Sequence, residues 1–399
     1  MRIVAIGDVG VVDSMMHIGD EAMFEQFLDQ ARSREVGDLV GISANPRETA
    51  ARYGIESVPR LGFTGDRAAM LERAEAILSG RIDADDPARP TIEAIGLADR
   101  VVVTGAGNLA STWPVHIIER WTISKLASRA GIPFIVTGQT LGPELTGDDE
   151  QLLEELLSSA QLVGVREAAS LALAERLGIQ RVEQTVDDAS FLKIDDPTTP
   201  EVTGDYCLVS LSTHVGAADR AGFQAAVADL LDSIARATGL GIVFYAHFGP
   251  LTGTAERGDV VMHTAVAELM SSRSEVVATG DSDAAAWLAR RASLVVSSRY
   301  HPAVFAVSAG VPTLGIAVDD YTTVKLTGAL GNFGQQSVIP ARELLAGAAP
   351  DVAASVWSDR VGIRDRSIAI AATQRPVSDE WWDRVVGASR TIRTCENFH

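Results

Sequence analysis

Short runs of apolar and β-branched residues recur along the first half of the chain, each followed by Gly or Asp and then by a longer helical stretch. Near-continuous apolar runs such as VVV and FIV are typical of strands in a parallel sheet that helices cover on both faces. The first half is therefore predicted to be a doubly wound α/β domain. Its predicted strands are Ile3–Ile6, Val101–Val103, Phe134–Val136, Leu162–Val165 and Val182–Val186.

The segment KIDDPTTPEVTGD, Lys193–Asp205, interrupts this alternation. It combines two prolines and several acids with little apolar content, so we predict an interdomain linker. The alternation of strands and helices then restarts, which predicts a second α/β domain. Its predicted strands are Cys207–Leu211, Ile242–Tyr245, Val276–Val277, Leu294–Ser297 and Thr313–Ile316.

We expect two doubly wound, Rossmann-like domains, residues 1–195 and 205–350, that face each other across a cleft. Ligands of open α/β sheets bind at the carboxyl ends of the strands, so the cleft is the expected binding site. Residues 351–399 form a predicted helical segment. Its Trp381 and Trp382 are large apolar side chains that need covering, so we expect the segment to pack back on the first domain.

Charge and cysteine content narrow the functional classes. Lys and Arg number 34 against 53 Asp and Glu, a net charge of −19, and no basic face or basic amphipathic stretch stands out. We therefore expect no nucleic-acid partner and no membrane-surface role. Cys207 and Cys395 lie far apart, which argues against a disulfide framework or a cysteine zinc site. The N-terminus has too few consecutive apolar residues for the hydrophobic region of a signal peptide, and no transmembrane segment is predicted. A cytoplasmic location is therefore expected.

The most informative stretch is LVVSSRYHPAVFAVSAGVPTLGI, residues 294–316. A strand ends there, and Pro302 suits the first turn of a following helix. Ser298, Arg299 and His301 thus lie where free N–H groups and the helix dipole attract anions. Arg299 adds a planar fork for carboxylate or phosphate, and His301 exchanges protons near neutral pH. The alternative is a structural role, with Arg299 in an interdomain salt bridge and His301 capping the helix. The two serines before this pair and the proline after it, at the end of a strand, favour a functional role.

A second stretch, GDVGVVDSMMHIGDEAMF from Gly7 to Phe24, leads from a strand through a loop into a helix. It lacks the G-x-G-x-x-G spacing of an ordinary dinucleotide site. Asp20 suits the N-cap of the helix. Two interpretations stay open for each polar residue: Asp20 is a cap or a substrate contact, and His17 is a polar loop residue or a substrate contact.

Small-residue loops follow two other strands. TGAGN holds Gly105 and Asn108, and TGQTLGP holds Gln139, whose amide could bond hydroxyl groups. Tight turning alone would also explain these loops. At the end of the next strand, Arg166 either faces the cleft or pairs with Glu167.

These segments, together with GVREAASLALAERLG, TVDDASFL and a following Lys325, resemble the polysaccharide pyruvyltransferase family. The resemblance runs from about Gly7 to Lys325, and SSRYHPAVFAVSAGVPTLGI is its most specific part. It implies a two-domain fold like that of B-type glycosyltransferases. It also implies transfer of the enolpyruvyl carbons of phosphoenolpyruvate to a sugar, usually as a ketal, with Arg299 and His301 as the functional pair.

In that reaction, His301 would protonate the methylene carbon of phosphoenolpyruvate. Arg299, assisted by Lys325 and the helix N-terminus, would hold its charged groups. Asp187 or Asp188 could act as the base toward the sugar hydroxyl. The expected acceptor is a sugar of a cell-surface polysaccharide or glycoconjugate precursor, which could be lipid-linked. The scheme needs no metal and no cofactor besides phosphoenolpyruvate as co-substrate.

Two alternatives stay open at this stage. One is a B-type glycosyltransferase that binds a nucleotide sugar with the same loops. The other is a binding protein without activity, since His17 stands where the family commonly has Asn and GAGN replaces a glycine triplet. The sequence leaves open the acceptor sugar, the choice between a ketal and an enolpyruvyl ether, and oligomerisation.

Overall fold

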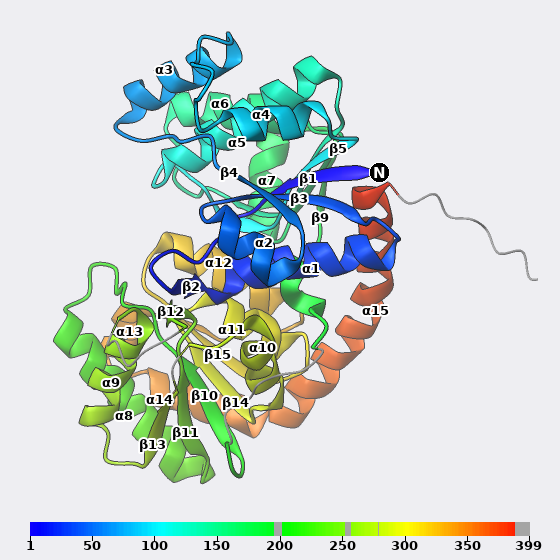
Figure 1. The fold of residues 1–399 in the computed structure, drawn as a ribbon. Coiled ribbons are helices and arrows are strands. Elements are labelled where there is room, and N and C mark those ends of the chain that lie inside the picture. The colour runs from blue at the N-terminus through cyan, green and yellow to red at the C-terminus, as the bar shows by residue number, and fades with distance from the viewer. Residues whose placement is uncertain (195–201, 252–256, 278, 388–399) are drawn as a thin grey trace, which may run out of the picture.

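The computed structural model describes residues 1–194, 202–251, 257–277 and 279–387. The chain forms two lobes, each built on a parallel sheet with helices packed against it (Figure 1). The central part of the predicted linker, residues 195–201, lies outside the described residues. Within the described ranges, no helix combines the length and the apolar content that crossing a membrane requires.

The first sheet has the strand order β4-β3-β1-β5-β7-β8-β9, with β6 against β7, and its pairs are parallel. The chain builds outward from β1 in one direction and from β5 in the other. Its topological switch point therefore lies between β1 and β5. The strands are β1 (Arg2–Ile6), β3 (Asp38–Ser43), β4 (Glu56–Pro59), β5 (Arg100–Val103), β6 (Ala106–Leu109), β7 (Phe134–Leu141), β8 (Leu162–Val165) and β9 (Val182–Gln184).

The second sheet repeats this plan with the parallel order β13-β11-β10-β14-β15-β16. Its switch point lies between β10 and β14, next to the most informative sequence stretch. The strands are β10 (Tyr206–Ser210), β11 (Gly241–Tyr245), β13 (Ser274–Val277), β14 (Leu294–Ser297), β15 (Thr313–Ala317) and β16 (Val338–Pro340).

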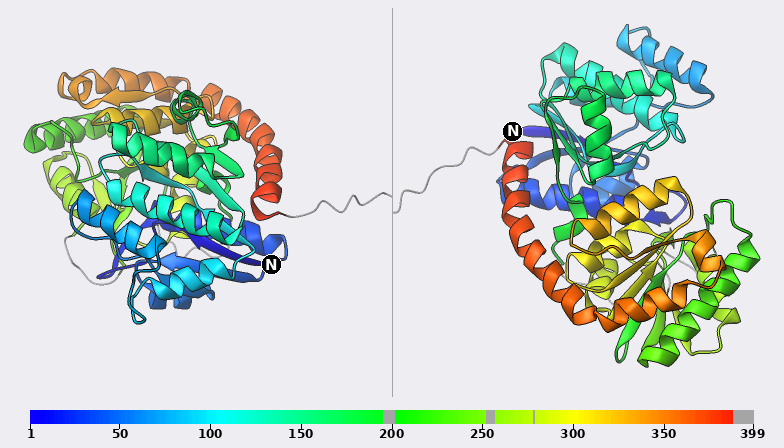
Figure 2. Two further views of the ribbon diagram at one scale, coloured as in Figure 1. Left: turned by 90° about the horizontal axis from the view of Figure 1, so that it is seen from above. Right: turned by 180° about the vertical axis from the view of Figure 1, so that it is seen from behind.

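Helices connect successive strands in both lobes (Figures 1 and 2). Those of the first lobe are α1 (Ile18–Ser33), α2 (Pro46–Tyr53), α3 (Arg67–Leu78), α4 (Arg89–Gly96), α5 (Pro114–Ala130), α6 (Gly147–Ser158), α7 (Ala168–Arg176) and the 3₁₀ turn η1 (Asp188–Phe191). Those that follow are α8 (Arg220–Thr238), α9 (Asp259–Leu269), α10 (Ser282–Arg291), α11 (Tyr300–Val307), α12 (Asp320–Gly331), α13 (Ala341–Leu345), α14 (Ala349–Ser358) and α15 (Arg360–Val386).

The predicted parallel α/β architecture is confirmed, and each predicted strand is present within a few residues. The structure adds β3 and β4, which the sequence pattern did not predict. Strand β3 starts at an exposed Asp38 and contains Gly41, and β4 ends at Pro59. These residues weaken the β signal, whereas pairing with the buried β1 stabilises β3 in the sheet.

A two-stranded antiparallel ribbon joins the lobes, formed by β2 (Met15–His17) and β12 (Phe248–Pro250). The ring of His17 stacks on Phe248 at 3.9 Å between centroids. The N–H of Ile18 donates to the carbonyl of His247 at 3.0 Å. This interlobe bond sets the start of α1, so His17 is the N-cap and Asp20 lies in the first turn. The prediction of Asp20 as the N-cap is therefore wrong.

The last helix, α15, extends from the second lobe along the side of the molecule to the first lobe (Figures 1 and 2). Near its end, Trp382 packs with Phe27 at 6.4 Å between ring centroids. The indole N–H of Trp381 donates to Thr137 Oγ1 at 3.0 Å. A Cβ on Gly164 would come within 2.5 Å of the Trp381 ring, so this glycine permits the close approach.

Candidate functional site

The loops at the carboxyl ends of both sheets border one cavity of about 810 Å³, here called the cleft pocket. In the second lobe its wall comes from the loops after β10, β14 and β15, and in the first lobe from segments that follow β1, β5, β7 and β8. Both switch points therefore open on the same space, as ligand sites of such folds do. The lining includes these predicted site residues: His17, Asp20, Arg166, Ser298, Arg299, His301 and Lys325.

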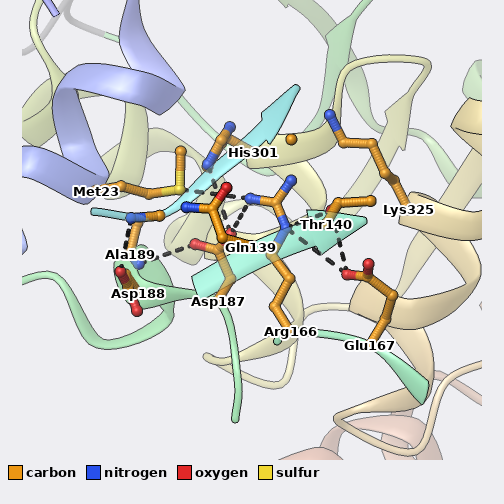
Figure 3. A network of polar contacts seen from close by, with 12 residues as sticks. Met23, Gln139, Thr140, Arg166, Glu167, Asp187, Asp188, Ala189, His301 and Lys325 are labelled. Carbon is orange, nitrogen blue, oxygen red and sulfur yellow. Dashed lines mark hydrogen bonds and ion pairs between the residues drawn. The ribbon is translucent and has the colours of Figure 1, made fainter. Parts of the chain in front are cut away.

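Arg166 is fully buried where β8 ends, at the centre of a polar network (Figure 3). Its Nη1 donates to Asp187 Oδ2 at 2.7 Å and its Nε to Thr140 Oγ1 at 2.8 Å. The guanidinium also lies 4.2 Å from the Tyr300 ring centroid. Its buried Nη2 has no hydrogen-bond partner among the described residues. Because a buried donor gains from a partner, this nitrogen is a candidate contact for an anionic ligand.

Lys325, on α12, comes close to the same place. Its Nζ donates to the hydroxyl of Tyr321 at 3.0 Å. A Cβ on Gly107 would lie 2.6 Å from Arg166 Nη2 and 2.7 Å from Lys325 Nζ, so both cations converge on one point that only glycine leaves open. Burial, and then the charge of Arg166, lower the pKa of Lys325 to about 7.

His301 lies in the first turn of α11, with Nε2 3.8 Å from Asp187 Oδ2 (Figure 3). A Cβ on Gly19 would come 1.7 Å from His301 Nδ1, so the ring rests directly against the start of α1. Burial, and then Arg166 and Lys325, hold the pKa of His301 well below its usual value. An anion bound between these cations and the imidazole would reverse the last two effects.

Arg299 forms a forked ion pair with Asp259, the first residue of α9. Its Nη2 lies 2.5 Å from Oδ1, and its Nε lies 3.0 Å from Oδ2. Asp259 is fully buried and also accepts the backbone N–H groups of His247 and Phe248. The pair lies within the second lobe, and its fork fixes Arg299 at the pocket wall.

The serines of the motif hold its loop in place. Ser298 Oγ accepts the N–H of Ser212 at 2.9 Å, and Ser297 Oγ accepts the N–H of Arg299 at 3.0 Å. The first bond ties the loop after β14 to the loop after β10, and the second lies within the turn that leads from β14 into α11. Arg299 is the N-cap of α11, so the positive end of that helix faces the pocket beside His301.

Asp20 is the acidic residue of the first turn of α1 that lines the pocket. Burial, and then the charge of Asp8, raise the pKa of Asp20 to about 7, against the opposing effect of Lys325 and Arg166. Its carboxyl group can therefore exchange a proton near neutral pH.

Several predicted residues do not line the pocket but support it. Gln139 is buried inside β7 and donates to the carbonyls of Thr104 and Thr137. The N–H of Gly105 donates to Asp188 Oδ2 at 3.0 Å, and Asn108 donates to Asp8 at 2.8 Å.

The two aspartates predicted as bases are engaged in the same scaffold. Asp187 holds Arg166 and accepts the N–H of Ala189, and Asp188 accepts the hydroxyl of Thr137. Both are almost fully buried outside the cleft pocket. Neither lines the cleft pocket in this structure, and their hydrogen bonds position other groups.

The structure also places residues in the site that the sequence analysis did not assign to it. Tyr300 belongs to the sequence stretch 294–316, so its position could have indicated a role. No local sequence pattern marks Tyr321, Trp113 or Asp259 as site residues. Trp113 lines the pocket, and 36% of its surface is exposed. Its ring meets that of Tyr321 edge-on, with 5.1 Å between the ring centroids. His247 also lines the pocket. Among the described residues, no group of three or more His, Cys, Asp or Glu side chains is arranged to hold a metal ion.

The sequence model of the family described as "Polysaccharide pyruvyl transferase" matches residues 17–320. The match includes the loop at His17 and the whole stretch 294–316, and it ends shortly before Lys325. A search of curated proteins finds no match.

Solved structures share the fold at low identity. A UDP-GlcNAc 2-epimerase from Neisseria meningitidis, bound to UDP-GlcNAc, is 12% identical, with 98% of this chain and 95% of that chain covered and a TM-score of 0.56. A putative UDP-N-acetylglucosamine 2-epimerase from Listeria monocytogenes is 11% identical, with 96% and 94% covered and a TM-score of 0.60. The calicheamicin glycosyltransferase CalG4 is 15% identical, with 98% and 99% covered and a TM-score of 0.54. The predicted glycosyltransferase-B-like fold is thereby confirmed.

Proposed function

The chain belongs to the polysaccharide pyruvyl transferase family, and we propose that it transfers a pyruvyl group from phosphoenolpyruvate to a saccharide as a ketal. The observation that carries the proposal is the convergence of Arg166 and Lys325 on one point of the cleft pocket, beside His301. Phosphoenolpyruvate carries a carboxylate and a phosphate, one of which would bind at this point and the other beside it. Neighbouring cations with free donors match two anionic groups on one small molecule.

The donor would bind against these cations and the start of α11. Arg166 Nη2 and Lys325 Nζ would hold one anionic group, and Arg299 with the N-terminus of α11 the other. The anion then opposes the two charges that lower the pKa of His301. Donor binding would therefore load the imidazole with a proton, which is the form that general acid catalysis needs.

The proposed reaction begins with proton transfer from His301 to the methylene carbon, which becomes a methyl group and leaves a cationic centre at the adjacent carbon. A saccharide hydroxyl adds to that centre. Asp20 would take its proton, since its pKa is raised to about 7 and it lies at the pocket wall. The carbon–oxygen bond to phosphate then breaks, phosphate leaves, and a second hydroxyl adds and releases its proton to close the ketal.

The cavity has room for an acceptor beside the donor. Phosphoenolpyruvate has only about ten non-hydrogen atoms, whereas pockets of several hundred Å³ hold larger ligands. The cleft pocket measures about 810 Å³. Trp113, on its wall, offers an apolar ring face against which the C–H face of a sugar would pack.

Ligand-dependent melting tests this proposal. Phosphoenolpyruvate at about one hundred times its dissociation constant should stabilise the protein by about 2.7 kcal/mol. Lys325→Met should weaken this effect. The matched control Lys125→Met removes a charge whose partner is Glu155, outside the site, and should not. Stabilisation by UDP but not by phosphoenolpyruvate would overturn the proposal and favour a nucleotide-sugar enzyme, the activity of the fold relatives.

Product analysis tests the transfer itself. With phosphoenolpyruvate and a panel of neutral saccharides, turnover should release phosphate. In deuterated water the acceptor should gain a pyruvate methyl group that contains deuterium. A product that keeps the vinyl methylene would be an enolpyruvyl ether, and would refute the ketal.

A further inference from the structure

A second cavity, of about 580 Å³, lies at the opposite end of the second sheet from the cleft pocket. Its wall includes Asp205, Ser293 and Pro312, which immediately precede β10, β14 and β15. The beginning of α15, which Figure 1 shows beside the second lobe, also contributes to its lining. We call it the arginine cavity, because four of its lining residues are Arg290, Arg291, Arg360 and Arg364.

Positive charge is concentrated here without acidic partners. Within the described part of the chain, none of the four guanidinium groups has a carboxylate within 4.0 Å. Of the described lining residues, Asp205 alone is acidic. The whole chain carries a net charge of −19, so composition does not explain four unpaired arginines around one cavity.

Rings and carbonyl groups hold three of the guanidinium groups instead, those of Arg290, Arg291 and Arg360. Arg291 lies 4.7 Å from the Trp287 ring centroid, and Arg360 lies 4.5 Å from that of Trp357. Such stacking orients the planar group and leaves its charge in place. Arg360 donates one hydrogen bond, from Nη1 to the carbonyl of Trp357 at 2.9 Å.

Arg290 lies in a positively charged environment. It is half-buried and donates to the carbonyl of Leu192 at 2.7 Å. Burial, and then the charge of Arg375, lower the pKa of Arg290 to about 10, against the opposing effect of Asp283. A bound anion would offset both effects.

We propose that the arginine cavity binds a ligand that carries two or more phosphate groups. Planar guanidinium forks match phosphate oxygens, and a cavity of about 580 Å³ lined by four arginines has room and donors for more than one phosphate group. The source is either a soluble diphosphate or the phosphate headgroups of a lipid surface. This inference does not depend on pyruvyl transfer.

Calorimetric titration with inorganic pyrophosphate tests the site. Arg360→Gln combined with Arg364→Gln should weaken one binding event by about tenfold or more, since hydrogen bonds to charged groups are lost. Both residues are exposed on α15, so the melting temperature should change little. The control combines Arg81→Gln with Arg342→Gln, two exposed arginines elsewhere, and should bind as the unmodified protein does. Absent binding, or equal loss in both double variants, overturns the proposal.

Vesicle sedimentation separates the two sources. Phosphatidylcholine vesicles with phosphatidylglycerol should bind the unmodified protein, and not the Arg360/Arg364 variant, if headgroups are the ligand. Pyrophosphate binding without vesicle binding assigns a soluble ligand. If neither probe binds through these arginines, the inference is wrong. Pyruvyl transfer measured on the same variant should be unchanged, and its failure in the unmodified protein would refute the proposed function alone.

Discussion

The cleft pocket and the arginine cavity lie at opposite ends of β14, and they hold positive charge in different ways. In the cleft pocket, Arg166 and Arg299 are each fixed by a buried acid, Asp187 and Asp259. In the arginine cavity, Arg291, Arg360 and Arg364 are exposed, the first two stack on indole rings, and no carboxylate lies within 4.0 Å of them among the described residues.

The difference reflects the cost of burying a charge. An unpaired buried ion costs several kcal/mol, so a buried cation needs a fixed acid, and the pair in turn fixes the direction of its remaining N–H groups. An exposed guanidinium carries no such cost, so it needs no fixed acid beside it. Changes in the cleft pocket should therefore alter the reaction rate, whereas changes in the arginine cavity should alter attraction of phosphates only.

The largest effect is expected at His301. His301→Gln keeps Arg166 and Lys325, so phosphoenolpyruvate should bind nearly as before, while turnover falls roughly 10²- to 10⁴-fold with the loss of the acid. His214→Gln, at the rim of the same pocket, is the matched control and should retain most activity. Steady-state kinetics and deuterium incorporation give the readout. Unchanged rate and labelling in His301→Gln would move the acid elsewhere, with His17 or His247 next.

A smaller loss is expected from one methyl group at the start of α1. The Cβ in Gly19→Ala would stand 1.7 Å from His301 Nδ1, so the ring must move. Displacement of a catalytic group by about 1 Å can cost about 10²-fold in rate. Gly96→Ala, in another helix with nothing within 4 Å, should keep full activity and gain at most about 1 kcal/mol of stability. Equal activity of both variants would contradict this packing argument.

Local sequence pattern was sufficient to locate part of this site. A β-branched strand followed by Pro302 specifies where β14 ends and α11 begins, and Arg299 and His301 follow from that position. The contact of Gly19 with His301 depends on packing between segments far apart in the sequence. No local signal marks Asp259 as the partner of Arg299 either.

The arginine cavity was missed for the same reason. Its charges come from two short segments, residues 290–291 and 360–364, and neither is a basic run. Only the fold brings the start of α15 beside the end of α10. The start of α1 was misplaced likewise, because an interlobe bond from Ile18 to the carbonyl of His247 decides where the helix begins.

The affinity of the cleft pocket for phosphoenolpyruvate should depend on pH. In the free protein the pKa of Lys325 is lowered to about 7 and that of His301 lies well below its usual value. A bound anion raises both pKa values, so binding takes up protons and the affinity falls as the pH rises. Between pH 7 and 9, where the phosphate is fully ionised, the loss should approach about tenfold per pH unit for each proton taken up. Calorimetric titration in two buffers of different ionisation enthalpy measures this uptake; proton release would contradict the assignment.

The smallest expected effect is that of salt, and it compares the two cavities directly. Between about 0.1 and 1 M KCl the Debye length falls from about 10 to about 3 Å, which screens exposed charges far more than buried ones. Pyrophosphate bound at Arg360 and Arg364 should lose several-fold more affinity than phosphoenolpyruvate bound at the buried Arg166. Titrations at both salt concentrations, each ligand with the unmodified protein and the Arg360/Arg364 variant, separate competition by chloride from screening. Equal salt dependence of the two ligands would mean that burial does not distinguish the cavities, because the cleft cations would then be as open to ions as those on α15.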